Sequence, residues 1–351
     1  MAEENQTTHK RRVRYSGKYP KKLEEKYKEL QPEKYKDTIE HVIKKGNTPA
    51  GMHISIMVNE ILDFLKIQPG EIGFDATLGY GGHTKAMLQC LNGQGHIYAT
   101  DVDPEESAKT RKRLEEAGFG EDILTIRLQN FCTIDEIAKE VGGFDFILAD
   151  LGVSSMQIDN PKRGFSFKVD GPLDLRLNQE AGISAAERLD TITKDELAGM
   201  LYENSDEPYC EELAKAITDE IRKGNRIDTT TKLRNIIEKT LDFLPEKEKK
   251  DTIKKTCQRT FQALRIDVNR EFEVLYEFME KLPDALKPGG RAAILTFHSG
   301  EDKLVKKALK EGYRAGVYAD YAKDVIRPSA QECAQNGRAR STKMRWAVKA
   351  E

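Results

Sequence analysis

Glycines and acids follow two neighbouring apolar runs early in the chain. Residues 74–83 read Phe-Asp-Ala-Thr-Leu-Gly-Tyr-Gly-Gly-His, and residues 100–103 read Thr-Asp-Val-Asp. This order indicates a strand, a glycine turn, a helix and a second strand that ends in an acid, as in the nucleotide pockets of parallel sheets. Glycine lets the backbone pass close to a ligand, and Asp101 can accept hydrogen bonds from both hydroxyls of a ribose. The pattern therefore predicts a site for an adenosine-containing cofactor.

Two adenosine cofactors fit this pattern to different degrees. A dinucleotide fold has the series Gly-x-Gly-x-x-Gly, but Thr84 occupies the third glycine position here. Asp75 precedes the turn, and a carboxylate is a poor neighbour for a pyrophosphate. S-adenosylmethionine has no phosphate and carries a positive sulfonium and an amino group, which suit an acid at this place. We therefore predict S-adenosylmethionine, and a nicotinamide-dependent oxidoreductase is the less favoured alternative.

The third and fourth predicted strands end in residues that would complete the pocket. Phe131 follows the third strand and can cover an adenine, although a phenylalanine that caps the hydrophobic core is an equally good interpretation. Asp150 opens the turn Asp-Leu-Gly-Val-Ser-Ser after the fourth strand, at the crevice where chemistry takes place in such sheets. Its alternative role is to cap the next helix, which the small and polar turn makes the weaker interpretation.

Strands that alternate with helical segments predict an α/β fold with a parallel, doubly wound sheet. The predicted strands are Ile72–Ala76, His96–Thr100, Leu124–Leu128, Phe144–Ala149, Arg291–Phe297 and Lys343–Lys349. A short helix is expected over Ile56–Leu65. Between the fourth and fifth strands the segments are charged and helix-like, which predicts an inserted all-helical domain. A single long helix over Arg259–Leu286 would return the chain to the sheet.

The composition is that of a chain without a membrane span. The net charge is −2, and no run approaches the roughly 18 apolar residues of a transmembrane helix. The five cysteines are scattered, and the six histidines do not cluster with acids at metal-ligand spacing. We therefore expect a cytoplasmic protein with free thiols, no metal and no membrane partner. Residues 1–50 carry thirteen Lys and Arg and eight Asp and Glu, which indicates a basic arm that contacts phosphate locally or a solvated tail.

Several blocks between His53 and Trp346 resemble those of the ribosomal RNA small subunit methyltransferase H family. They are residues 75–83, 150–155, 163–167 (Arg-Gly-Phe-Ser-Phe), 170–176 (Asp-Gly-Pro-Leu-Asp-Leu-Arg), 260–266 (Thr-Phe-Gln-Ala-Leu-Arg-Ile) and 297–302 (Phe-His-Ser-Gly-Glu-Asp). The chain departs from the family pattern at residues 202–205, at residues 255–258 and at Gly300, where the family has leucine. These departures are compatible with a divergent paralogue that has another RNA target.

The resemblance implies an S-adenosylmethionine-dependent enzyme that methylates the exocyclic amine (N4) of a cytidine in the decoding region of small-subunit (16S) rRNA. By motif position it implies cofactor contacts from Gly81, Gly82, His83, Asp101, Phe131, Asp150 and Gln157. It implies a Rossmann-like methyltransferase domain in two parts (51–157 and 256–351), with a helical substrate-recognition insert (158–255). The basic N-terminal extension (1–50) is an addition to the family pattern. The expected partners are small-subunit rRNA or the assembled small ribosomal subunit, and a homodimer is one further option. The same chemistry on another RNA and a noncatalytic RNA-binding assembly protein are the alternatives.

Candidate roles in methyl transfer follow from the chemistry of cytidine. Its amine is a poor nucleophile, and acceptors aimed at the N–H groups would stabilise the charge that develops on nitrogen. Asp150, with the turn that follows it, is the candidate catalytic residue, and no strong base is required. Arg163, Phe165, Phe167 and Arg176 form a basic-aromatic cluster suited to an extruded RNA base. Both phenylalanines are equally consistent with the core of the helical insert.

Each candidate residue in the second part of the methyltransferase domain (256–351) has a functional and a structural interpretation. Arg265 and Asn269, one helical turn apart, would line the crevice or form a structural hydrogen bond to the sheet. His298 follows a predicted strand and would be a tuned imidazole or, by default, a satisfied buried histidine. Four further cations would meet phosphates or lie on a solvated strand face: Arg338, Arg340, Lys343 and Arg345.

Overall fold

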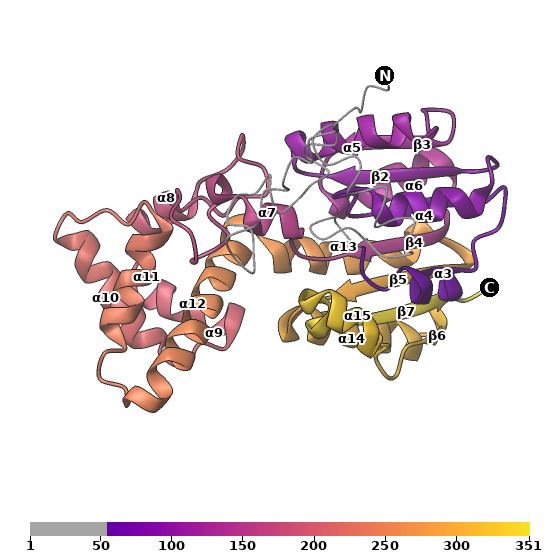
Figure 1. Ribbon diagram of the computed structural model, residues 1–351. Coiled ribbons are helices and arrows are strands. Elements are labelled where there is room, and N and C mark those ends of the chain that lie inside the picture. Colours follow the sequence, from indigo (N-terminus) through magenta and orange to yellow (C-terminus); the bar gives the residue numbers. More distant parts are fainter. Residues whose placement is uncertain (1–54) are drawn as a thin grey trace, which may run out of the picture. The chain divides into compact units, whose positions relative to one another are not determined.

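Seven strands form one sheet in the computed structural model, which describes residues 55–351 (Figure 1). The order across the sheet is β3-β2-β1-β4-β5-β7-β6. The strands are β1 Ile72–Asp75, β2 His96–Asp101, β3 Leu124–Leu128, β4 Phe144–Asp150, β5 Leu286–Thr296, β6 Tyr318–Tyr321 and β7 Lys343–Lys349. β1 to β5 are parallel, and β7 is antiparallel to both of its neighbours. The predicted α/β fold is confirmed.

All six predicted strands are present, and the sequence analysis missed one. β5 begins at Leu286 instead of Arg291, because residues 286–290 join the strand through an irregular register between Phe144 and Phe146. Gly289 in this segment has φ 70, a backbone conformation that glycine adopts without strain. The missed strand is β6, a short edge strand whose two central residues are exposed. Such a strand lacks the long apolar run by which the others were predicted.

Helices cover both faces of the sheet (Figure 1). α3 (Val58–Leu65), α4 (Gly82–Leu91) and α5 (Pro104–Glu116) pack on one face, and α6 (Ile134–Val141), α13 (Glu271–Ala285) and α14 (Ser299–Arg314) on the other. Phe74 and Phe146 show the division, because each is fully buried and they belong to the cores on opposite faces. Strands buried on both faces need apolar residues at successive positions, which explains their unbroken apolar runs.

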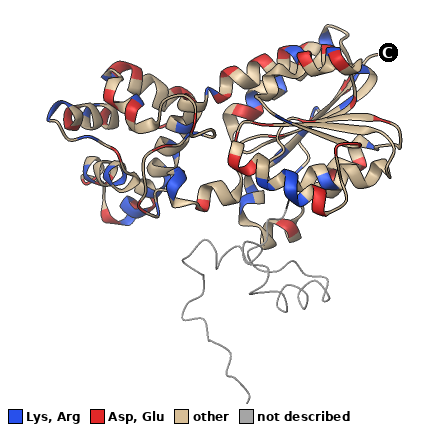
Figure 2. Ribbon diagram, turned by 90° about the horizontal axis from the view of Figure 1, so that it is seen from above, with Lys and Arg blue, Asp and Glu red and all other residues tan. Residues whose placement is uncertain are grey.

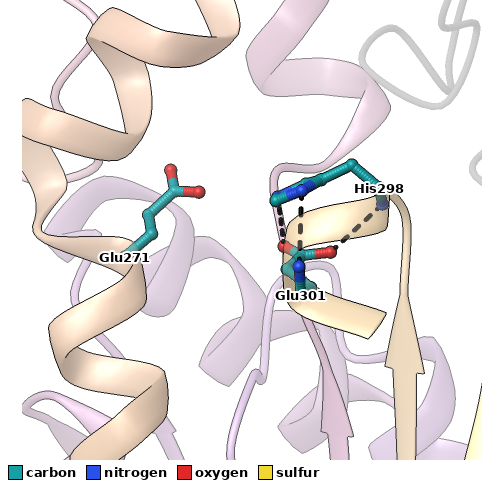
Figure 3. Close-up of side chains that lie close together, drawn as sticks. All are labelled: Glu271, His298 and Glu301. Carbon is teal, nitrogen blue, oxygen red and sulfur yellow. Dashed lines mark hydrogen bonds and ion pairs between the residues drawn. The ribbon is translucent and has the colours of Figure 1, made fainter. Parts of the chain in front are cut away.

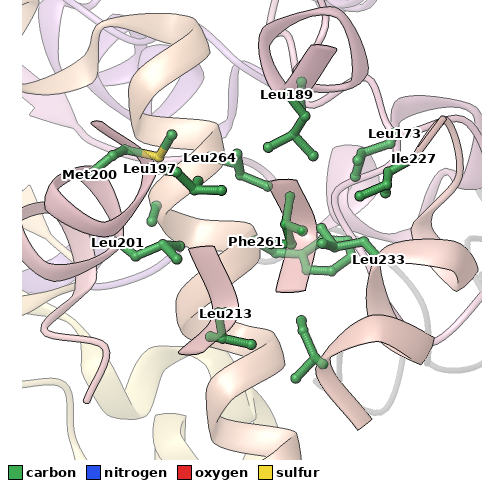
Figure 4. Close-up of a cluster of buried hydrophobic side chains, with 14 of the residues drawn as sticks. Leu173, Leu189, Leu197, Met200, Leu201, Leu213, Ile227, Leu233, Phe261 and Leu264 are labelled. Carbon is green, nitrogen blue, oxygen red and sulfur yellow. The ribbon is translucent and has the colours of Figure 1, made fainter. Parts of the chain in front are cut away.

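The helices between β4 and α13 share a core of their own (Figure 4). They are α7 Ser155–Asp159, α8 Ala185–Thr191, α9 Lys194–Ser205, α10 Cys210–Arg222, α11 Thr230–Thr240 and α12 Glu246–Asn269. Leu201, Leu213, Leu233 and Phe261 meet in this core, which we call the helical core. α12 runs without a break past residue 255, the predicted end of the insert. Its C-terminal half supplies Phe261 to the helical core and leads the chain back to the sheet.

The single helix predicted over Arg259–Leu286 is wrong. The chain forms α12 and α13, which are separated at Arg270 in a left-handed conformation with φ 51. α12 buries Phe261 in the helical core, whereas α13 buries Phe278 and Leu282 against the sheet. The break lets the two apolar faces point to different cores, which the apolar pattern of the sequence did not reveal.

Three further expectations concern the N-terminal region and the membrane. The basic extension expected over residues 1–50 lies outside the described residues. The short helix expected over Ile56–Leu65 is α3, which begins at Val58 after Met57 in a left-handed conformation. Among the helices of residues 55–351, none has the length and apolar character needed to cross a membrane.

Candidate active site

The glycine turn lies at the carboxyl edge of the sheet, between β1 and α4. Gly79 and Gly81 have φ 47 and φ 83, and Gly82 is the first residue of α4. A Cβ atom on Gly81 would lie 2.6 Å from Cγ2 of Thr110, and one on Gly82 would lie 2.0 Å from Oγ of Ser55. Close packing inside the protein therefore favours glycine at positions 81 and 82, and the positive φ favours it at position 79.

Asp75 is not exposed to the pocket, contrary to the expectation that it faces the cofactor. Its side chain is fully buried. Thr84 Oγ1 donates to one carboxylate oxygen at 2.7 Å, and the backbone N–H of Thr77 donates to the other at 3.0 Å. Burial raises the pKa of Asp75 despite these hydrogen bonds. Thr84, which replaces the third glycine of a dinucleotide fold, thus fixes the start of α4 to the end of β1.

Asp101 ends β2 as predicted and holds the glycine turn in place. Its Oδ2 accepts from the backbone N–H of Gly79 at 2.8 Å, and its Oδ1 accepts from that of Asp103 at 2.9 Å. Each carboxylate oxygen has capacity for a second hydrogen bond, so the group can still take ribose hydroxyls. Burial raises the pKa of Asp101 to about 6, against the lowering effect of these backbone hydrogen bonds.

His83 and Asp150 meet from neighbouring parts of the edge. His83 Nδ1 lies 3.4 Å from Asp150 Oδ2, and His83 Nε2 lies 2.8 Å from the carbonyl oxygen of Ile56. Burial opposes the charged imidazole, but hydrogen bonding and attraction to Asp150 prevail and raise the pKa of His83. The backbone N–H of Asp150 donates to Thr77 Oγ1 at 2.7 Å. Within residues 55–351 the buried Oδ1 of Asp150 has no hydrogen-bond partner.

Asp103 links several elements around the site, and the sequence analysis gave it no role. It is fully buried, and its Oδ1 caps α5 by accepting from the backbone N–H groups of Glu105 and Glu106. Its Oδ2 accepts from Gln157 Nε2 at 2.9 Å and from Arg163 at 2.6 Å. An aspartate directly before Pro104 is a helix-start signal and could have predicted the cap, but not the two distant partners.

Gln157 lies in the same network, and both the oxygen and the nitrogen of its side-chain amide form hydrogen bonds. Its Oε1 accepts from the backbone N–H of Ser154, and its own backbone N–H donates to Ser154 Oγ, so the pair forms a capping box at the start of α7. Since its Nε2 donates to Asp103, the side chain links the ends of β2 and β4. Only the family resemblance pointed to Gln157 from the sequence.

Phe131 follows β3 and packs on the sheet. Its ring meets that of Phe278 edge to face, with centroids 5.2 Å apart, and it belongs to the rim of the core on that face. The ring is half-buried. The structure thus supports the core-capping interpretation, and the exposed part of the ring leaves contact with an adenine as a prediction.

The four residues predicted to hold an RNA base have partners inside the protein. Arg163 is buried, where it donates to Asp103 and to the carbonyl oxygen of Leu177. Arg176 forms two hydrogen bonds to the carboxylate of Asp174 at 2.8 Å each. Two aromatic rings belong to the helical core or its rim, Phe165 and Phe167. The alternative interpretation, that both phenylalanines are core residues, therefore describes their packing better.

The side chains of Arg265 and Asn269 bond to neighbouring parts of the chain instead of lining the crevice. Arg265 donates to both carboxylate oxygens of Glu271, at 2.8 and 2.9 Å, across the break between α12 and α13. Asn269 donates to the carbonyl oxygen of Leu175 and accepts from the backbone N–H of Leu177. The predicted structural hydrogen bond thus exists, but it reaches this loop and not the sheet.

His298 lies among acids, contrary to the expectation that no histidine clusters with them (Figure 3). Ligand atoms of Glu271, His298 and Glu301 lie within 4.8 Å of one another. His298 caps α14 by accepting from the backbone N–H of Glu301, and its Nε2 lies 3.2 Å from Glu301 Oε1. Arg265 pairs with Glu271, and Glu301 lies against His298, so both acids of the group already have a partner within the protein.

Three of the four cations near the C-terminus are engaged within the protein. Arg345 is buried and pairs with Asp302 at 2.7 Å, and Lys343 pairs with the same carboxylate at 2.9 Å. Arg338 pairs with Asp159 at 3.1 Å. Arg340 is exposed, so of this group it alone remains a candidate for phosphate contact.

The donor and acceptor groups at the edge fit S-adenosylmethionine. Asp101 retains acceptor capacity for a ribose, and the partly exposed carboxylate of Asp150 suits a group that donates hydrogen bonds. The Rossmann-like sheet and this edge define the class of S-adenosylmethionine-dependent methyltransferases. Residues 50–350 match the model of the MraW methylase family. The chain belongs to this family, which confirms the resemblance found in the sequence, the enzyme class and the cofactor.

Relatives cover the chain along nearly its full length. It is 87% identical to the ribosomal RNA small subunit methyltransferase H 1 of Agathobacter rectalis, with 100% of both chains covered. It is 69% identical to the protein of the same name from Lachnoclostridium phytofermentans, over 99% of this chain and 95% of that one. A ribosomal RNA small subunit methyltransferase H 2 from Alkaliphilus metalliredigens is 64% identical over 97% of each.

Proposed function

We propose that this enzyme methylates the exocyclic N4 of a cytidine in small-subunit rRNA, with S-adenosylmethionine as the methyl donor. The names of its relatives support the RNA class. The observation that carries the chemistry is Asp150, a carboxylate at the end of β4 whose side chain is 26% exposed beside the glycine turn. An amine that donates N–H to this carboxylate would be held at the edge of the cofactor pocket.

Each residue at the edge has a separate proposed role in cofactor binding or in methyl transfer. When bound, S-adenosylmethionine supplies an electrophilic methyl group. Asp101 and the glycine turn would hold its ribose, and Phe131 would cover its adenine. Asp150 would orient the cytidine amine and stabilise the positive charge that develops on nitrogen. His83 fixes the other carboxylate oxygen of Asp150, and the proton leaves to water after transfer.

The proposed substrate also assigns roles beyond the edge. The insert over residues 158–255 would recognise the RNA, and the parts 51–157 and 256–351 would form the methyltransferase domain. Ribosomal RNA as substrate would place the reaction in the cytoplasm. Methylation assays of free rRNA and of the assembled subunit, with the same enzyme preparation, identify which of the two is the substrate.

Nucleoside mass spectrometry tests the proposed function directly. Small subunits from cells that lack the gene are incubated with the protein and S-adenosylmethionine, digested and compared with untreated subunits. We expect N4-methylcytidine only in the treated sample. A methylated nucleoside of another type would reject the N4 assignment, and binding of subunits without any methylation would favour the noncatalytic assembly protein.

The affinity for S-adenosylmethionine should depend on pH through Asp101. Its pKa of about 6 applies to the free protein, and ribose hydroxyls donate to the carboxylate, so binding lowers that pKa. Protons must therefore leave on binding at acidic pH, and the Kd should be constant above pH 7 and rise by up to about tenfold per pH unit below 6. Calorimetric titrations between pH 5 and 8 measure this. Asp101→Asn should bind more weakly and lose the dependence; an unchanged profile in this variant would assign it to another group.

A further inference from the structure

A pocket of about 490 Å³ lies in the helical part, and its lining includes Phe167, one of the residues predicted to hold an RNA base. It is bounded by α11, by the N-terminal half of α12 and by the loop that contains Phe167 and Lys168. Its volume is in the range of pockets that take small ligands or single nucleotides. None of its lining residues belongs to the cofactor edge.

Three lysines in the pocket wall have no ionic partner. Lys168, Lys250 and Lys254 are exposed, and within residues 55–351 none of their ammonium groups forms an ion pair or a hydrogen bond. Lys250 and Lys254 are four residues apart on α12 and so lie on one face of it, and Lys168 comes from the facing loop. Unpaired lysines brought together from two segments repel one another and favour an anionic ligand between them.

The other charged groups of the pocket neutralise one another. Arg234 donates to Glu238 at 2.8 Å, and Lys249 lies 2.5 Å from Asp242 and 3.4 Å from Glu246. The pocket therefore has an excess of three positive charges, although the whole chain carries −2. Basic and acidic residues are interspersed along the helices of the protein (Figure 2).

One wall of the pocket is apolar and aromatic. Phe167 lines it together with Ile253 and Cys257. The Phe167 ring is fixed by an edge-to-face contact with Phe261, with centroids 5.8 Å apart, and remains half-buried. A fixed aromatic ring beside unpaired lysines is the combination by which proteins hold single-stranded nucleic acid, with the base stacked and the phosphate neutralised.

We propose that this pocket binds one nucleotide of the substrate RNA at a distance from the methylated base. The proposal rests on the proposed function, since it names a second contact of the same RNA. Phe167 stacks on the base, and the three unpaired lysines meet its phosphate and the adjoining ones. The pocket thus anchors the RNA without taking part in methyl transfer.

The triple variant Lys168→Glu/Lys250→Glu/Lys254→Glu tests the anchor. The control is Lys303→Glu/Lys307→Glu/Lys310→Glu, which makes the same change of charge at three exposed, unpaired lysines of α14. Binding to unmethylated small subunits is measured by filter retention at several salt concentrations. The pocket variant should bind at least about tenfold more weakly, with a salt slope smaller by about two or three, whereas the control changes little. Equal losses in both variants, or wild-type binding by the pocket variant, would overturn the proposal.

Two further measurements separate this proposal from the proposed function. Phe167→Leu keeps an apolar contact with Phe261 but removes the stacking surface, so it should weaken binding several-fold without changing the salt slope. If the RNA is the substrate, the lysine variant should raise the KM for small subunits and leave kcat and the Kd for S-adenosylmethionine unchanged. Weaker binding by the pocket variants without any methylation by the wild type would retain the pocket and reject the function. A fall in kcat at unchanged KM would contradict an anchoring role.

Discussion

Replacing Asp150 by asparagine is expected to lower the rate of methylation by about 100- to 1000-fold, the usual cost of losing one group that stabilises charge in a transition state. The asparagine amide has the same size, but it carries no negative charge with which to stabilise the positive charge that develops on the amine. The Kd for S-adenosylmethionine should change by much less, because Asp101 and the glycine turn would remain in place. Single-turnover methylation with saturating cofactor, together with calorimetry, measures both quantities.

Asp145→Asn is a matched control, since it makes the same change at the other end of β4. Asp145 pairs there with Lys287 at 2.7 Å and accepts from the backbone N–H of Ile72, away from the carboxyl edge of the sheet. We expect this variant to lose some stability and to retain the methylation rate. If Asp150→Asn weakened cofactor binding as much as it slowed methylation, Asp150 would be a cofactor ligand only.

Replacing Arg163 by leucine should cause the largest loss of stability among the site variants. Arg163 is 4% exposed and its partner Asp103 is fully buried, so removing the guanidinium leaves a buried carboxylate without its charge partner. Breaking a pair of this kind costs about 3–5 kcal/mol. Because Asp103 also caps α5 and holds Gln157, the Kd for S-adenosylmethionine should rise as well. Chemical denaturation and calorimetry measure the two effects.

The expected loss of stability depends on the burial of the ion pair, and two further variants test this dependence. Arg226→Leu removes an arginine from the exposed pair with Asp190 in the helical part, and exposed pairs contribute little, so we expect a much smaller change. Adding Asp103→Asn to Arg163→Leu removes the uncompensated charge and keeps an oxygen for the cap of α5, so stability should partly return. Equal losses for Arg163→Leu and Arg226→Leu would show that the burial of the pair does not matter.

Much of the candidate site could be read from the residues that follow predicted strands. Asp101 and Asp150 were placed correctly at the carboxyl edge, because parallel strands end at a common edge and the apolar runs located those ends. Asp75 was misjudged by the same reasoning. It also ends a strand, but Thr84 comes from the helix above it and occupies its carboxylate. Whether an acid faces a pocket or a neighbouring hydroxyl depends on packing that local sequence does not contain.

By itself the sequence determined the α/β fold, six of the seven strands, the cofactor class and the family. These depend on runs of apolar residues and on short motifs, both of which are local. The tertiary structure alone decided which buried polar groups bond to each other. Arg163 meets Asp103 across sixty positions, and the helix break at Arg270 places neighbouring apolar faces in two different cores. The physical reason is that a buried charge or an apolar face takes whatever partner the folded chain brings near, and residues far apart in the sequence carry no local sign of that meeting.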